Sequence, residues 1–197
     1  MNIDKFLEEL SWFSIKKLSN THDLKNFSCG KTKDNNELDL FLKEDALKQQ
    51  EQKINVTHVA VLKNTKKVIG YVTTLNDKLR VNNKEKKDLA IKANYSDFPS
   101  VKIGRLAVDT KYSNKQIATT LLRHIIGLVL TNTSDIGCRF LIVDSYPESV
   151  GFYLKKGFIL NLVQDQTRTK ILDKNTREVI NKTQRETISL RFDLLNK

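Results

Sequence analysis

The stretch from residue 101 to 158 contains the residue types and spacing best suited to chemistry. The strand pattern VKIGRLAV is followed by the polar turn DTKYSNKQ and then by the apolar helix pattern IATTLLRHII. A helix that begins so soon after a strand presents unpaired N–H groups and the positive end of its dipole. Such an end binds phosphate or pyrophosphate readily. The sequence therefore predicts an anion site at this turn, followed by a buried strand and the pattern FYLKKGF.

Alternating strand and helix patterns must position this stretch. Strands are expected at 11–18, 57–62, 68–75, 101–108, 140–143 and from 157 onward. Helices are expected at 1–10, from 34 for about 15 residues, at 113–130 and at 148–156. This order predicts a mixed α/β sheet with helices on both faces.

Several features of these elements are specific enough to be checked. Asp34 and Glu37 form the pattern of a capping box. The helix at 113–130 has an apolar stripe, made of Ile117, Leu121, Ile125 and Leu128. The polar, Lys-rich residues 77–100 are expected to form an irregular, partly helical insertion. Residues 164–195 are expected to form a long β-hairpin with its turn at 173–177.

Composition limits the class of protein. The chain has 197 residues, with 34 Lys and Arg against 23 Asp and Glu, a net charge of +11 and 39% hydrophobic residues. It is too apolar for a disordered chain and too polar for a membrane protein. Cys29 and Cys138 form no CxxC pair, and the first ten residues lack the pattern of a signal peptide. We expect reduced thiols, a cytoplasmic location and no membrane partner.

Three pieces of the sequence together resemble the GCN5-related N-acetyltransferase (GNAT) superfamily. They are FSCG with NNELDLFLKEDAL (27–47), IGRLAVDTKYSNKQIATTLL (103–122) and GFYLKKGFIL (151–160). The first is similar to a branch that includes acetyltransferase toxins of toxin–antitoxin pairs. The resemblance implies a GNAT acyl-CoA N-acyltransferase fold in one domain over 1–197, with the core at about 11–165 and the hairpin at about 164–195.

The resemblance also implies a site. Acetyl-CoA is the cosubstrate, no metal is needed, and Tyr153 matches the tyrosine that donates a proton to the leaving thiolate. Transfer to a primary amine is direct, so no nucleophilic cysteine is required. The residues implied in cofactor binding are Leu106, Ala107 and Val108 for pantetheine, and Ser113, Asn114, Lys115, Gln116, Ile117, Ala118 and Thr119 for the pyrophosphate.

The turn departs from the family pattern Q/R-x-x-G-x-G/A. Ser113 stands at the Q/R position and Gln116 at the first glycine, and only Ala118 fits. Glycine serves there because the backbone approaches phosphate closely or takes positive φ. Gln116 is expected to crowd that approach, whereas Asn114 tolerates left-handed geometry. We therefore expect weaker pyrophosphate binding, offset by the charges of Lys111 and Lys115.

Simpler interpretations compete at several residues. Tyr153 could be an ordinary half-buried tyrosine, and Cys29 is expected to be a small buried hydrophobe. His58 and Asp144 are conceivable bases, although structural roles are favoured for both. His22 and His124 are expected at the surface or at an edge.

The acceptor and the partners are left open. The charge could serve solubility or could bind a polyanion. Basic residues of the C-terminal hairpin would suit tRNA: Arg168, Lys170, Lys182, Arg185 and Arg191. The hypotheses are an N-acetyltransferase with an unidentified amine acceptor, a toxin-type enzyme that acetylates aminoacyl-tRNA and pairs with an antitoxin protein, and a GNAT-like nucleic-acid or protein-binding module without activity. A dimer is plausible.

Overall fold

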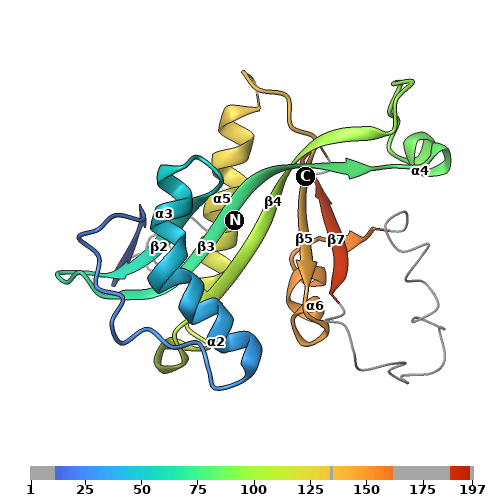
Figure 1. Cartoon of the computed structure of the whole chain (residues 1–197). Coiled ribbons are helices and arrows are strands. Elements are labelled where there is room, and N and C mark those ends of the chain that lie inside the picture. Colours follow the sequence, from blue (N-terminus) through green and yellow to red (C-terminus); the bar gives the residue numbers. More distant parts are fainter. Residues whose placement is uncertain (1–11, 134, 162–186, 196–197) are drawn as a thin grey trace. The chain divides into compact units, whose positions relative to one another are not determined.

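The computed structural model describes residues 12–133, 135–161 and 187–195, and Figure 1 labels their helices and strands. In these ranges the strands form a seven-stranded mixed sheet. They are β1 (Phe13–Lys17), β2 (Val56–Leu62), β3 (Val68–Arg80), β4 (Asp97–Val108), β5 (Phe140–Ser145), β6 (Ile159–Leu160) and β7 (Ile188–Asp193). The helices are α2 (Lys33–Leu40), α3 (Ala46–Glu51), α4 (Asn83–Asp88), α5 (Ile117–Asn132) and α6 (Pro147–Leu154). The expected helix at 1–10 lies outside the described residues.

The chain divides into two compact units, Met1–Leu75 with Ile103–Asn132 and Asn76–Lys102 with Thr133–Lys197. In the first unit the strand order is β1-β2-β3-β4, with β1, β2 and β3 antiparallel as the expected hairpin requires. Alternation along β2 and β3 directs side chains to both faces. Val59 and Tyr71 pack with Phe41 and Leu42 on one face, whereas Gly70 lies against Ile117 of α5 on the other.

The first long helix begins earlier than expected, and its cap is a different residue. Thr32 is the N-cap, because its side-chain oxygen accepts a hydrogen bond from the backbone N–H of Asn35 at 3.2 Å. The prediction of Asp34 and Glu37 as the capping box was therefore wrong. A π-helical turn (Phe41–Asp45) joins α2 to α3, and it buries Phe41 and Leu42 against the sheet.

Helix α5 also differs from the prediction in detail. It begins at Ile117, since residues 113–116 form the turn, and it ends at Asn132. Ile117, Leu121 and Ile125 are buried as predicted, but Leu128 is 39% exposed and Val129 is buried instead. A 3.6-residue period places residue 128 on the same side as 117, 121 and 125, so the packing around the last turns of α5, and not the period, leaves Leu128 exposed.

In the second unit, β7 lies between β5 and β6 and pairs antiparallel with both. The Lys-rich segment is more regular than expected. Strands β3 and β4 extend through Arg80 and from Asp97, and α4 between them has a true capping box made by Asn82 and Glu85. The core contains Leu79, Val81, Phe98, Phe140 and Ile142. Most of the expected hairpin at 164–195, with its turn, lies outside the described residues; β7 is its described part.

No helix in the described ranges is long and apolar enough to cross a membrane.

Candidate functional site

The turn after β4 is anchored within the first unit by backbone hydrogen bonds. The N–H of Asp109 donates to the carbonyl of Ile69 at 3.0 Å, and that of Thr110 donates to Ser28 at 2.9 Å. The carboxylate of Asp109 is buried and accepts from the N–H of Lys111 at 2.9 Å, which caps a short 3-10 turn (Thr110–Tyr112). The predicted pantetheine-binding residues Leu106, Ala107 and Val108 are the last three of β4, directly before this anchor.

Residues 113–116 are exposed, and two of them take left-handed backbone conformations. The φ angle is 62° at Asn114 and 61° at Gln116. An L-residue other than glycine or asparagine pays roughly 1–2 kcal/mol for this conformation. The turn thus keeps a backbone suited to glycine although neither residue is glycine, and Gln116 is the strained one. Strain of this kind persists where the surrounding structure fixes it, often at ligand sites.

The start of α5 is held against β3 by a close approach of backbone. A Cβ built on Gly70 would lie 2.8 Å from Cγ2 of Ile117 and 3.3 Å from the carbonyl oxygen of Ala107. Only glycine permits this approach without a shift. The first N–H groups of α5, which include those of the predicted residues Ile117, Ala118 and Thr119, have no intrahelical carbonyl to bind. This end of the helix therefore suits an anion, as the sequence predicts.

Replacing Gln116 with glycine is expected to stabilise the protein by about 0.5–1 kcal/mol, because relief of left-handed strain exceeds the entropy that glycine costs. The carbonyl of residue 116, which accepts from the N–H of Thr120 at 2.9 Å, is unchanged. Urea unfolding monitored by circular dichroism measures the effect. Asn114→Gly is the matched control and should change the free energy of unfolding less, since asparagine tolerates positive φ. If Gln116→Gly lowers the free energy of unfolding, the left-handed backbone of Gln116 is not strained and the prediction is wrong.

Tyr153 lies in the second unit, on α6, and its side chain is 5% exposed. Its ring makes edge-to-face contacts with Phe152 at 5.1 Å and Phe158 at 5.3 Å between centroids. Burial raises the pKa of Tyr153 above its ordinary value. The phenol therefore stays protonated at neutral pH and can act as a hydrogen-bond or proton donor. It is more buried than the half-buried tyrosine of the simpler interpretation.

The FYLKKGF pattern has a structural reason in the second unit. Gly157 has a φ of 87°, a conformation that reverses the chain after α6. The N–H of Phe158 then donates to the carbonyl of Tyr153 at 3.2 Å. The ring of Phe158 packs between Tyr153 and Phe192, with centroids 5.5 Å apart in the second pair. This row of rings fixes the position of the Tyr153 side chain.

Asp144, one of the two candidate bases, is paired with a lysine. Asp144 accepts a hydrogen bond from Lys102 at 2.7 Å, and Asp77 lies 3.6 Å from the same ammonium. Burial lowers the pKa of Lys102, but the hydrogen bond from Lys102 to Asp144 and the charges of Asp144 and Asp77 outweigh it and raise the pKa overall. The Lys102 contact was not predicted, although a carboxylate at the end of a buried strand signals the need for a cationic partner.

His58 and His124 contact each other, with ring centroids 4.9 Å apart. Burial, with the charges of His124 and Lys17, lowers the pKa of His58 to about 4. Burial likewise lowers the pKa of His124. Both rings are therefore neutral at neutral pH, and a base with a pKa near 4 removes a proton from an ammonium poorly. The structural interpretation of His58 is supported. His124 is only partly buried, which agrees with the expected position at an edge.

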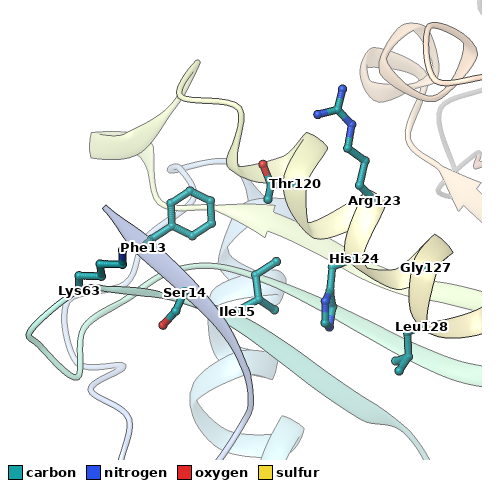
Figure 2. Close-up of a pocket in the computed structure, with 9 residues that line it drawn as sticks. All are labelled: Phe13, Ser14, Ile15, Lys63, Thr120, Arg123, His124, Gly127 and Leu128. Atoms are coloured by element: carbon teal, nitrogen blue, oxygen red, sulfur yellow. The ribbon is translucent and has the colours of Figure 1, made fainter. Parts of the chain in front are cut away.

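Figure 2 shows a pocket of about 510 Å³ between β1 and α5. Its lining combines apolar side chains with cationic ones and contains no carboxylate; it consists of Phe13, Ser14, Ile15, Lys63, Thr120, Arg123, His124, Gly127 and Leu128. None of the residues predicted to bind the cofactor lines this pocket. It is therefore separate from the turn at 113–116.

Two further predictions can be compared with the structure. Cys29 is half-buried and free, and burial, followed by its hydrogen bond with Asp39, raises the pKa of its thiol to about 12, which makes it unreactive as expected. Arg191 is buried rather than part of a basic surface, because it forms an ion pair with Glu85 at 2.6 Å. The described residues contain no group of three or more His, Cys, Asp or Glu side chains that could hold a metal ion.

Comparison with solved structures finds the same fold in bacterial toxins. A tyrosine-to-phenylalanine mutant of KacT is 20% identical, with a TM-score of 0.71 over 94% of this chain and 96% of that chain. AtaT complexed with acetyl-methionyl-tRNAfMet is 23% identical, with a TM-score of 0.69 over 92% of this chain and 94% of that one. AtaTR bound with AcCoA is 23% identical, with a TM-score of 0.68 over 94% and 96%.

The acetyltransferase (GNAT) domain model matches residues 29–173, well over half of the chain. This match includes β4, the turn at 113–116, α5 and the FYLKKGF segment with Tyr153. The protein therefore belongs to the GNAT acetyltransferases, enzymes that transfer an acetyl group from acetyl-CoA.

Proposed function

We propose that this chain transfers the acetyl group of acetyl-CoA to the primary amine of an aminoacyl-tRNA. The observation that carries the donor half is the turn at 113–116, which keeps left-handed backbone at Asn114 and Gln116 without glycine. In the proposal, the turn and the first N–H groups of α5 hold the pyrophosphate. The backbone of Leu106, Ala107 and Val108 pairs with pantetheine. Family membership supports both assignments.

The reaction forms one bond and breaks one. The neutral amine nitrogen attacks the carbonyl carbon of the thioester, and the C–S bond breaks. The amine loses a proton to solvent, and the leaving thiolate gains one. Tyr153 is the proposed donor of that second proton, because its phenol stays protonated in its buried ring environment. No covalent enzyme intermediate is needed, in agreement with the unreactive thiol of Cys29.

Two observations support an aminoacyl-tRNA acceptor. The solved complex of AtaT contains acetyl-methionyl-tRNAfMet, a product of acetyl transfer to a charged tRNA. This chain carries a net charge of +11, which favours binding to a polyanion. Because AtaT is also known bound to the C-terminus of the antitoxin AtaR, we further propose an antitoxin protein as a binding partner of this chain.

The test is acetyl transfer in vitro. Purified protein is incubated with radiolabelled acetyl-CoA and a set of charged tRNAs, and acid-precipitable label is counted. Label is expected on at least one charged tRNA and not on the same tRNA after deacylation. The reason is that the acceptor is the free amine of the amino acid, which deacylation removes from the tRNA. Labelling of deacylated tRNA, or transfer only to small amines, would contradict the proposed acceptor. Failure to bind acetyl-CoA in calorimetry would contradict the donor half and favour a binding module.

A further inference from the structure

Two aromatic rings and two ammonium groups gather beside the turn, within the first unit. We call Trp12, Lys67, Tyr112 and Lys115 the ring cluster. The rings of Trp12 and Tyr112 are stacked, with centroids 6.2 Å apart and planes 17° from parallel. Nζ of Lys115 lies 5.7 Å from the Trp12 centroid and 5.6 Å from that of Tyr112. Nζ of Lys67 lies 5.0 Å from the Tyr112 centroid.

The ring cluster is continuous with the turn. Lys115 lies between the two left-handed residues, Asn114 and Gln116, and Tyr112 ends the 3-10 turn before them. The backbone of Trp12 is held by a hydrogen bond, because its carbonyl accepts from the N–H of Lys63 at 3.0 Å. Cation–π contact with two rings restricts the Lys115 ammonium to the neighbourhood of the turn. The sequence predicts a charge role for Lys115 but not its contacts with the rings of Trp12 and Tyr112.

The ammonium groups of Lys67 and Lys115 both lie near the ring of Tyr112. Lys67 donates a hydrogen bond to the Tyr112 hydroxyl at 3.2 Å, and this contact raises the pKa of Lys67. Among the described residues, the carboxylates of Asp23 and Asp109 also act on Lys67. Two positive charges that share one aromatic ring repel each other, and a dianion placed between them relieves that repulsion. A phosphate monoester is such a dianion, and it binds lysine through charge-assisted hydrogen bonds.

We propose that the ring cluster binds the 3′-phosphate of the adenosine of acetyl-CoA and selects acetyl-CoA over its 3′-dephospho form. The proposal rests on the proposed placement of the pyrophosphate at the turn. In coenzyme A the 3′-phosphate and the 5′-diphosphate leave the same ribose. A diphosphate held at the turn therefore brings the monoester within one sugar of it, where Lys115 and Lys67 present their charges.

The experiment uses the only tryptophan of the chain, which is Trp12. Its fluorescence is titrated with acetyl-CoA and with acetyl-3′-dephospho-CoA, and the two dissociation constants are compared. The wild-type protein should bind the dephospho form roughly tenfold more weakly, because charge-assisted contacts are lost. Lys67→Met, at a residue outside the turn, should lose roughly tenfold in affinity for acetyl-CoA and little for the dephospho form, whereas Lys115→Met should weaken binding of both and reduce the difference between them. Lys66→Met removes an exposed lysine from the same β2–β3 hairpin turn and should change neither constant.

Equal wild-type affinity for both ligands would overturn the proposal while leaving the acetyl-CoA site intact. Failure of the wild type to bind either ligand would overturn the proposed function together with this inference. Unchanged discrimination in Lys115→Met and Lys67→Met, with weakened binding of tRNA, would also overturn the proposal and show an RNA surface instead. An equal loss in Lys66→Met would show a general charge effect, which likewise contradicts a site built by the ring cluster.

Discussion

Replacing Tyr153 with phenylalanine is expected to lower turnover by about 10²–10⁴-fold and to leave the affinity for acetyl-CoA unchanged. This range is typical for the loss of a general acid. The substitution removes only the hydroxyl, so the ring contacts with Phe152 and Phe158 remain. Burial keeps the phenol protonated, and phenylalanine supplies no proton to the leaving thiolate. Release of free thiol measures turnover, and calorimetry with acetyl-CoA measures binding.

A second tyrosine provides the matched control. Tyr95 is in the same unit and is 62% exposed. Tyr95→Phe should therefore keep both turnover and affinity. Full activity of Tyr153→Phe would exclude Tyr153 as the proton donor and restore the interpretation as a core tyrosine. A parallel loss of affinity and thermal stability would point to a packing role, so the melting temperature of both variants should be measured.

Replacing Glu85 with leucine is expected to lower the free energy of unfolding by about 3–5 kcal/mol. The side chains of Glu85 and Arg191 are each 5% exposed, and their charged atoms are 2.6 Å apart. Removal of Glu85 leaves a buried guanidinium without its counter-charge. It also removes the capping box of α4, in which the Glu85 carboxylate accepts from the N–H of Asn82 at 3.2 Å. Urea unfolding followed by circular dichroism measures this loss.

The double variant Glu85→Leu with Arg191→Met separates the cost of an unpaired charge from the value of the pair. Two apolar side chains leave no buried charge, so the double variant should be more stable than Glu85→Leu alone. Lys78→Met is the surface comparison. The ion pair of Lys78 with Asp97 has side chains 70% and 39% exposed, and its loss should cost much less than the loss of Glu85. If Glu85→Leu is as stable as the wild type, the buried Arg191 does not need the Glu85 carboxylate as its counter-charge, and the prediction is wrong.

Predictions from the spacing of apolar residues agreed with the structure where they depend on the pattern within a single strand or helix. The strand runs at 57–62 and 68–75 form the expected hairpin, and the helix after the turn buries Ile117, Leu121 and Ile125. The predictions were wrong where two nearby residues could each take the same capping or core position. Thr32 rather than Asp34 caps α2, because capping depends on which side chain reaches a free N–H. Leu128 was assigned to the core, although Val129 completes the buried side of α5.

The sequence by itself determined the family, the mixed α/β fold class and the position of the turn, because these depend on periodic patterns and short motifs within continuous segments. Only the tertiary structure showed that Gln116 takes the left-handed backbone of a glycine. It also showed that the chain before this turn is anchored to distant segments by the hydrogen bonds of Asp109 and Thr110. It also brought Trp12, Lys67 and Lys115 around one tyrosine and buried Arg191 against Glu85. These contacts join residues far apart in the chain, and charge composition alone does not distinguish a paired cation from an exposed one.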